Sequence, residues 1–588
     1  MKNVLPSALA LTLVSTLVPS LFGLPGAVAA AGPPTPSLTF HAITFKPAGG
    51  EPVAAEAGVL TVPENRHGGS GKMIELHLVR FPATARPAGP PIVYLAGGPG
   101  GSGIAAARGS RFPLFMALRA FGDVIALDQR GTGESRPSTD CDAPFMLPLD
   151  EPLDPRAGGA ALAAGMGRCF TELRGLGIEP ADFDTLENAD DLDDLRRALG
   201  VDKIRLWGIS YGTHLALATL RAHGAHVASA ILAGLEPLGH TLKLPADQQA
   251  EIAEVSRLAA ADPTVGAAVP NLAATLDELL GELADHPRSV TLVHPITGKP
   301  VAVTVGAFDL QVVVAGMLRG PESFADLPDL LTRLAGGDWT ALALRAAPIR
   351  LGSLPGAMSV AMDCASGADA SWRRRIALEA PGTLLGDAIN FPFPQICQGL
   401  EVPQLGDDFR RPVRSEVPVL LISGSLDGRT PPANFAEELP LLPNAREVRV
   451  VGAGHGDDLF LASPKILEVM ESFLRGEDAS ATIVLDPPRF VAPRKVVTLP
   501  DEVLARYVGT YRIAPGDVRR VLEAGALLFT RRNDGPPLPL RPTSSTDFFW
   551  EGPPGSVHFE VSPEGEVLAM DADLDGTGRH LQRAAKVE

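Results

Sequence analysis

One segment constrains the fold more than any other: residues 203–220 predict a buried strand that runs without a loop into a helix. The junction reads Gly208-Ile209-Ser210-Tyr211-Gly212, a G-x-S-x-G pattern. Glycines on both sides leave room where the two backbones crowd each other, and the central serine is held strained and exposed. An ordinary glycine-flanked turn is the alternative, but the adjoining strand and helix favour a nucleophile turn.

Apolar, β-rich runs recur along the chain and predict a buried sheet. Near-continuous apolar strands are typical of parallel sheets covered on both faces. Between two of these runs, residues 185–199 carry leucines at helical spacing, and Gly200 supplies a stop. Strand, helix and strand in succession imply right-handed crossovers and an α/β fold. The predicted strands are residues 91–96, 123–127, 203–207, 226–233, 417–422 and 447–451.

The remaining segments divide the 588 residues into further parts. From residue 236 to residue 414 the apolar strand-like runs no longer recur, and the stretch is rich in Ala and Leu. This composition predicts a helical cap with one hairpin at residues 290–304, which turns near Thr297-Gly298. A helix that begins at Ser463-Pro464 should end the sheet near Gly476. We therefore expect the following parts: core residues 30–235, cap 236–414, core 415–476, linker 477–500, and a small antiparallel β domain at residues 501–588.

The N-terminus resembles an export signal. Met1-Lys2, an apolar run over residues 5–24 and then Ala27-Val28-Ala29 give a charged start, a hydrophobic middle and a small-residue cleavage site. A membrane anchor is the alternative, but prolines and glycines interrupt the run. We expect residues 1–29 to be a cleaved signal peptide and the mature protein, beginning near Ala30, to be secreted or periplasmic without stable membrane insertion.

Four cysteines remain in the mature chain, and an even set in an oxidising compartment favours disulfides. Cys141 with Cys169 and Cys364 with Cys397 close the shortest loops of the three possible pairings, so we expect those pairs. With no CxxC spacing, we expect no zinc and no other metal. A net charge of −18 without a sustained basic run argues against a nucleic-acid partner.

A serine hydroxyl needs an imidazole to accept its proton and a carboxylate to orient that imidazole. His455 lies in a glycine-lined loop directly after one predicted strand, and Asp427 follows the preceding one. Asp457 and Asp458 are nearby alternatives for the carboxylate. The order Ser210, Asp427, His455 is that of the α/β-hydrolases, so we predict these three as catalytic residues.

A second glycine-rich segment follows the strand at residues 91–96. It reads Gly97-Gly98-Pro99-Gly100-Gly101-Ser102-Gly103, and its backbone N–H groups can face a developing oxyanion. We predict the amides of Gly98 and Tyr211 as the oxyanion hole. The same segment fits a dinucleotide fingerprint, with Asp128 at the end of the next strand. That interpretation leaves the serine, aspartate and histidine unexplained, so we expect no cofactor.

Together these motifs resemble the prolyl iminopeptidase and tripeptidyl aminopeptidase family of α/β-hydrolase serine peptidases. The resemblance covers residues 40–475 and includes the segment that runs from Asp128 through Arg130 to Ser135. It implies an α/β-hydrolase fold, a mostly parallel sheet flanked by helices, with a helical cap that limits access. In these enzymes the Asp128 segment shapes the wall behind the nucleophile, so we expect a structural role for Asp128 and Arg130. Ala96 departs from the His or Pro usual before the paired glycines.

The family resemblance implies an exported peptidase that releases N-terminal residues or short units from peptides. Glu236 and Asp363 are candidates for binding the substrate ammonium, since charge pairing is strengthened in a low-dielectric pocket. An esterase with the same three residues is the alternative, and a noncatalytic peptide-binding protein is another. Residues 501–588 resemble the lipocalin-like β domain appended to some serine hydrolases, and the aromatic residues 548–550 are expected in its core. The oligomeric state is not predicted.

Overall fold

The computed structural model describes residues 36–587, apart from residues 67, 69–70, 142–144, 294–298, 526, 536, 553–554 and 575–580. The predicted signal peptide and the expected hairpin turn at Thr297-Gly298 lie outside the described residues. Among the described residues, no helix is both long enough and apolar enough to cross a bilayer.

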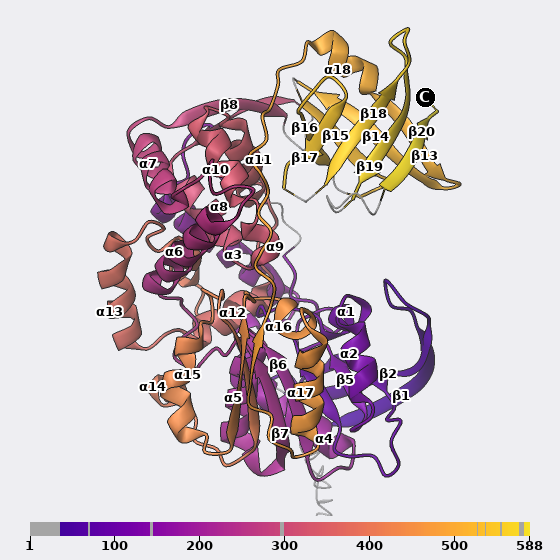
Figure 1. The fold of residues 1–588 in the computed structure, drawn as a ribbon. Coiled ribbons are helices and arrows are strands. Elements are labelled where there is room, and N and C mark those ends of the chain that lie inside the picture. Colours follow the sequence, from indigo (N-terminus) through magenta and orange to yellow (C-terminus); the bar gives the residue numbers. More distant parts are fainter. Residues whose placement is uncertain are drawn as a thin grey trace, which may run out of the picture. The chain divides into compact units, whose positions relative to one another are not determined.

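A ten-stranded sheet forms the centre of the fold (Figure 1). Its order is β1-β2-β3-β5-β4-β6-β7-β10-β11-β12, and every neighbouring pair from β5 to β12 is parallel. The six runs predicted as strands all pair in this sheet, which confirms the α/β-hydrolase fold. They are β4 (Ile92–Leu95), β5 (Val124–Leu127), β6 (Ile204–Ile209), β7 (Val227–Ala233), β10 (Val419–Gly424) and β11 (Ala445–Val451).

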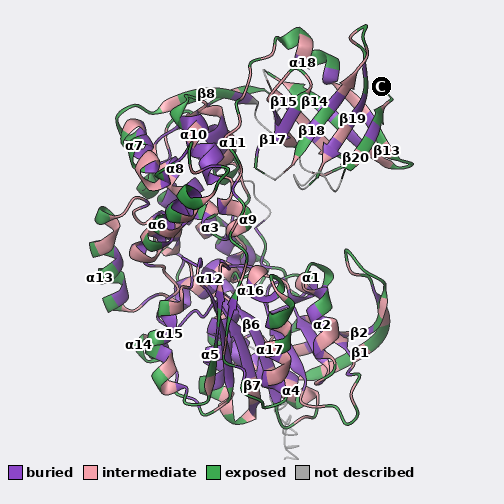
Figure 2. Ribbon diagram, in the orientation of Figure 1, coloured by how far each residue is buried: buried purple, intermediate pink, exposed green. Residues whose placement is uncertain are grey.

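Helices cover both faces of the sheet, because alternate side chains of each strand point to opposite sides. In β4, Val93 and Leu95 pack in one cluster, with α4 (Thr185–Ala198) and α5 (Tyr211–His223). Ile92 and Tyr94 pack in the other, with α1 (Gly103–Arg108), α2 (Phe112–Leu118), α16 (Asp458–Leu461) and α17 (Pro464–Leu474). The strands β4, β5 and β10 are buried along their whole length, and β6 and β7 along most of theirs (Figure 2).

The sheet is wider than the sequence predicts at both edges. Three strands, β1 (Ser37–Phe45), β2 (Val53–Pro63) and β3 (Met73–Phe81), form an antiparallel meander that joins β5. At the other edge, β12 (Ala481–Val484) pairs with β11, so the expectation that the sheet ends near Gly476 was wrong. In β1 exposed and half-buried residues alternate, and β12 has a single buried residue, so both lack a continuous buried apolar run.

Between β7 and β10 the chain forms a mainly helical region with its own apolar cluster. It contains a two-stranded hairpin, β8 (Arg288–Val293) with β9 (Pro300–Val305). The longer helices are α6 (Pro245–Ala261), α7 (Leu272–Asp285), α8 (Ala307–Met317), α10 (Leu327–Ala335), α11 (Thr340–Arg350), α12 (Ala357–Ser366) and α13 (Ala370–Glu379). One more helix, α3 (Pro155–Gly175), precedes this region in sequence and lies between β5 and α4.

The C-terminal part is a closed antiparallel barrel of eight strands, preceded by α18 (Asp501–Tyr507). Phe548 and Trp550 pack in its core, as expected, while the neighbouring Phe549 stacks against the guanidinium of Arg494 at 3.7 Å. The strands are β13 (Gly509–Ala514), β14 (Asp517–Ala524), β15 (Leu527–Arg532), β16 (Leu538–Pro542), β17 (Asp547–Trp550), β18 (Ser556–Val561), β19 (Val567–Asp573) and β20 (Leu581–Lys586).

Buried ion pairs join this barrel to the helical region. Glu551, just after β17, accepts hydrogen bonds from Arg333 of α10 at 2.7 and 2.9 Å, and from Arg345 of α11. These guanidinium groups overcome the cost of burial and lower the pKa of Glu551 to about 2. The carboxylate is therefore ionised in the folded protein. Removing it would take one ion-pair partner from each arginine and leave Arg333 with Asp329 and Asp338, and Arg345 with Asp326.

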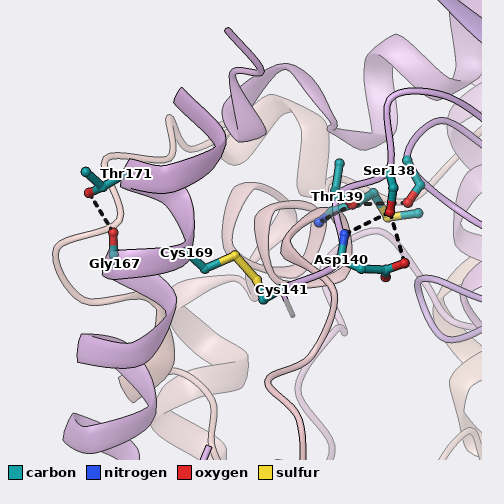
Figure 3. Close-up of a disulfide and its surroundings, with 9 residues drawn as sticks. Ser138, Thr139, Asp140, Cys141, Gly167, Cys169 and Thr171 are labelled. Carbon is teal, nitrogen blue, oxygen red and sulfur yellow. Dashed lines mark hydrogen bonds between the residues drawn. A yellow bond between two sulfur atoms is a disulfide. The ribbon is translucent and has the colours of Figure 1, made fainter. Parts of the chain in front are cut away.

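Both expected disulfides are present. Cys141 is bonded to Cys169 of α3 (Figure 3), and Cys364 of α12 is bonded to Cys397. Each bond closes a short loop, with sequence separations of 28 and 33 residues. The first ties α3 to the segment after β5, and the second fixes the end of α12 that lies near the candidate site.

Candidate active site

Ser210 occupies the turn between β6 and α5 with φ 54° and ψ −127°, a strained backbone for a residue with a side chain. The two flanking glycines make the turn possible. A Cβ on Gly208 would lie 2.6 Å from the carbonyl oxygen of Gly212, and a Cβ on Gly212 would lie 2.1 Å from that of Leu95. No side chain fits at either position, so the sequence pattern is required by the packing of the turn.

The structure brings the three predicted catalytic residues together from three loops. His455 Nε2 lies 3.0 Å from Ser210 Oγ, and His455 Nδ1 lies 3.0 Å from Asp427 Oδ2. Asp427 follows β10 and His455 follows β11, so neighbouring parallel strands place both at the same edge of the sheet as Ser210. A hydroxyl, an imidazole and a carboxylate thus form one continuous hydrogen-bonded chain.

A residue that the sequence analysis missed, Thr430, completes this chain. Its hydroxyl donates to Asp427 Oδ2 at 2.7 Å and lies 2.9 Å from His455 Nδ1. The backbone N–H groups of Arg429 and Thr430 donate to Asp427 Oδ1 at 2.9 and 2.8 Å. Burial opposes ionisation of Asp427, but His455 and these donors outweigh it and lower its pKa to about 2.

The alternative aspartates have other partners. Asp457 pairs with Arg111 at 2.7 Å, and Asp458 accepts from the backbone N–H of Gly454. Neither forms a hydrogen bond with His455 among the contacts of the described residues.

Asp128 and Arg130 have buried polar partners. Asp128 accepts from Ser102 Oγ at 2.6 Å, while Arg130 is fully buried against Asp191 at 2.8 Å. Both contacts agree with the structural role expected for this segment.

The two amides predicted as an oxyanion hole flank Ser210. Tyr211 is the first residue of α5, and the first N–H groups of a helix have no carbonyl partner within it. Gly98 has φ +125°, and the preceding Gly97 is so close that a Cβ there would lie 3.0 Å from Ser210 Cβ. The structure therefore places both backbone segments beside the serine.

Two cavities lie at this edge of the sheet. One, of about 570 Å³, is lined by Ser210 and His455, and we call it the nucleophile cavity. The other, of about 470 Å³, is lined by Glu236 and Asp363, and we call it the acidic cavity. Gly98 and Arg429 line both, so the two cavities meet next to the nucleophile.

Glu236 and Asp363, the predicted ammonium-binding acids, share the acidic cavity but differ in surroundings. Glu236 forms an ion pair with Lys243, and its backbone N–H donates to Thr213 Oγ1 at 2.8 Å. Asp363 lies on α12 close to Glu236, and burial, reinforced by that neighbouring charge, raises its pKa well above the ordinary value. An incoming cation would reverse this effect by stabilising the ionised form.

This geometry is suited to nucleophilic attack on a carbonyl carbon. The imidazole can take the serine proton, the ionised Asp427 can stabilise the resulting imidazolium, and backbone amides lie on the other side of the hydroxyl. Among the described residues, no group of three or more His, Cys, Asp or Glu side chains could hold a metal ion.

Two family models match the chain. Residues 90–289 match the alpha/beta hydrolase fold, and residues 389–479 match the TAP-like protein family. The chain carries α/β-hydrolase and TAP-like domains. The first match includes β4 to α7 and the Ser210 turn, and the second includes the loops that carry Asp427 and His455.

Two curated relatives of this chain are peptidases by name. Serine protease Hip1 of Mycobacterium tuberculosis is 34% identical over 191 residues, which is 31% of this chain and 36% of that protein. Tripeptidyl aminopeptidase of Streptomyces lividans is 30% identical over 180 residues, 28% of this chain and 32% of that protein. The matched stretch thus spans about a third of each relative. Among solved structures, a thermophilic esterase from Thermogutta terrifontis is 16% identical, covering 71% of this chain and 98% of its own, with a TM-score of 0.30.

Proposed function

We propose that this chain is an exported serine peptidase, an aminopeptidase that releases N-terminal residues or short units from peptides through an acyl-enzyme on Ser210. The observation that carries the proposal is the hydrogen-bonded chain from Ser210 Oγ through His455 to Asp427, with 3.0 Å at each link. The names of the curated relatives support peptide bonds as the target.

In the proposed reaction, Ser210 Oγ attacks the peptide carbonyl carbon while His455 Nε2 accepts the hydroxyl proton. The oxyanion that forms is stabilised by the N–H groups of Gly98 and Tyr211. His455 then gives the proton to the departing amine, and the C–N bond breaks to leave an ester on Ser210. Water, deprotonated by His455, hydrolyses that ester and restores the serine. Asp427 stays ionised throughout and orients the imidazole.

The acidic cavity is proposed to hold the N-terminal part of the substrate. An ammonium group next to Glu236 and Asp363 would favour the ionised form of Asp363, whose burial otherwise keeps it neutral. The ammonium group would thus bind to the negative charge on Asp363 that its own presence stabilises. Asp363→Asn should therefore raise KM for peptides with a free N-terminus more than for the same peptides N-acetylated.

Export is proposed on two features: the signal-like residues 1–29 and the two disulfides, which are typical of oxidising compartments. N-terminal sequencing of protein recovered outside the cytoplasm tests this. A first residue near Ala30 is expected, and intact Met1 on the exported protein would contradict the proposal.

A peptide library read by mass spectrometry tests the activity. The parent should shorten peptides from the N-terminus, and Ser210→Ala should lower turnover by several orders of magnitude while keeping the fold. Aminoacyl-naphthylamides compared with acyl nitrophenyl esters separate the peptidase from an esterase, because the three residues alone do not choose between amide and ester. Turnover of esters with no amide cleavage would favour the esterase.

A further inference from the structure

Two arginines line the nucleophile cavity without a hydrogen-bond or ion-pair partner for their side chains among the described residues. The backbone N–H of Arg429 is fixed to Asp427 Oδ1, and the backbone carbonyl of Arg319 accepts from the N–H of His455 at 2.6 Å. Both side chains line the cavity that contains Ser210. Neither guanidinium forms a hydrogen bond or an ion pair with any residue that the structure describes. Their backbones are thus tied to the candidate catalytic residues, while no ion pair holds either guanidinium. Asp427, Glu236 and Glu251 act on the charge of Arg429 only through space, and Arg319 acts on Asp457 in the same way.

A guanidinium without an ion pair is costly where it is withdrawn from water, which favours a ligand role for Arg429, whereas Arg319 is exposed and keeps its contact with solvent. Arg429 is partly buried, and this burial lowers its pKa, although arginine keeps its charge at physiological pH. The third arginine of this cavity, Arg111, is already paired with Asp457. Asp457 is also the only carboxylate among the described residues that line this cavity, so its wall carries excess positive charge.

The proton transfer decides which part of a substrate occupies each cavity. In the proposed reaction His455 gives its proton to the departing amine, so the leaving group must lie on the side of His455. His455 and Ser210 line the nucleophile cavity, whereas neither lines the acidic cavity. Gly98, the proposed oxyanion donor, lines both and places the scissile carbonyl at their junction. The acyl portion thus extends toward the acids and the leaving portion into the nucleophile cavity, where Arg319 lines the wall and Arg429 lies at the junction of the two cavities.

We propose that Arg429 and Arg319 bind a carboxylate on the leaving-group side of the peptide, so that substrates whose released portion is anionic are preferred. This inference rests on the proposed peptidase function and deepens it. Guanidinium groups bind carboxylates through paired, charge-assisted hydrogen bonds. The carboxylate has two possible sources, the free C-terminus of a short peptide or an acidic side chain next to the scissile bond.

Matched substrates test the proposal. Tripeptides Xaa-Ala-Ala are prepared with a free carboxylate and as C-terminal amides, and a second amidated set compares Asp with Asn after the scissile bond. A charged hydrogen bond predicts that kcat/KM for the anionic member exceeds that for its neutral partner about 10- to 100-fold. The set that shows this ratio identifies the source of the carboxylate. Equal rates within both pairs would overturn the proposal.

Variants assign the preference to the arginines. Arg429→Met and Arg319→Met should each reduce the ratio of anionic to neutral kcat/KM, with Arg429→Met bringing it to within about threefold of unity. Arg429→Lys should retain part of the ratio, because the charge stays while the paired geometry is lost. Arg168→Met is the matched control, an exposed arginine on α3 that lines neither cavity, and should leave the ratio unchanged. A ratio unaffected by either cavity variant contradicts the proposal.

A binding measurement separates this inference from the peptidase proposal. Ser210→Ala is titrated with Ala-Ala and with Ala-Ala amide in a calorimeter, and then Ser210→Ala/Arg429→Met is titrated in the same way. Ala-Ala should bind at least tenfold more tightly than its amide, and only when Arg429 is present. If the parent cleaves no peptide but this preference is seen, the peptidase function fails and the carboxylate site stands. No preference for the carboxylate overturns the site whatever the activity.

Discussion

Removing the Thr430 hydroxyl should slow the enzyme without unfolding it. The hydroxyl is one of two donors to Asp427 Oδ2, the oxygen that faces His455, so Thr430→Val leaves the imidazole as the sole partner of that oxygen. A hydrogen bond to a charged group contributes about 1.5–3 kcal/mol, and about 1.4 kcal/mol is a factor of ten in rate. We therefore expect kcat/KM to fall about 10- to 150-fold.

Steady-state kinetics on an aminoacyl-naphthylamide at pH 7 provide the assay. Asp427 has a pKa of about 2, so it stays ionised at pH 7 even after losing one donor, and the loss comes from the orientation of His455. Thr430→Ser is the control because it keeps the hydroxyl, and it should recover most of the activity. The reasoning is refuted if Thr430→Val stays within threefold of the parent, or if Thr430→Ser loses as much as Thr430→Val.

Three further predictions concern stability. Glu551 has a folded-state pKa of about 2 against 4.5 when free, so its ion pairs stabilise the fold above pH 4.5 and lose this effect as the pH falls toward 2. Glu551→Gln should lower the free energy of unfolding at pH 7 by about 3 kcal/mol in a denaturant titration, and an unchanged midpoint would contradict this. Burial raises the pKa of Glu251 on α6 well above 4.5, so the protonated side chain is compatible with the fold below pH 4.5, and the protein loses stability as the pH rises through the folded-state pKa. In thermal melts, Glu251→Gln should be more stable than the parent at pH 9 and similar to it at pH 4, and the reverse order would refute the assignment. The Cys364–Cys397 bond closes a loop of 33 residues, which stabilises the fold by about 3–4 kcal/mol in the chain-entropy model, and both cysteines line the acidic cavity. Replacing both with serine should lower the melting temperature and raise KM, whereas replacing Cys141 and Cys169 should affect stability alone.

The strands β4 and β5 could be predicted from sequence because each is apolar along its whole length, and β10 because it begins with four apolar residues. The edge strands of the sheet could not be predicted. In β1, exposed and half-buried residues alternate over Ser37–Phe45, and β12 has only four residues, so neither carries enough apolar signal to stand out from a loop. Their pairing is set by neighbours that are far away in the chain.

The candidate site likewise contains residues that the sequence predicts and residues that it does not. Ser210 and His455 lie in glycine-lined turns whose spacing is visible in the sequence, because close backbone contacts demand those glycines. Thr430 was missed, although an Asp followed three residues later by Thr is a pattern in which the carboxylate can accept from the backbone of a tight turn. Arg319 could not be predicted, since only the folded helical region brings this residue, two positions after the end of α8, to the His455 loop.

Covalent labelling of Ser210 tests the central claim most directly. The parent, treated with a fluorophosphonate and digested for mass spectrometry, should carry one adduct on Ser210, formed at least a hundredfold faster than in His455→Ala with the same circular dichroism spectrum. An adduct that forms at the same rate without His455, or none on Ser210 in the folded parent, would contradict an activated nucleophile at this turn.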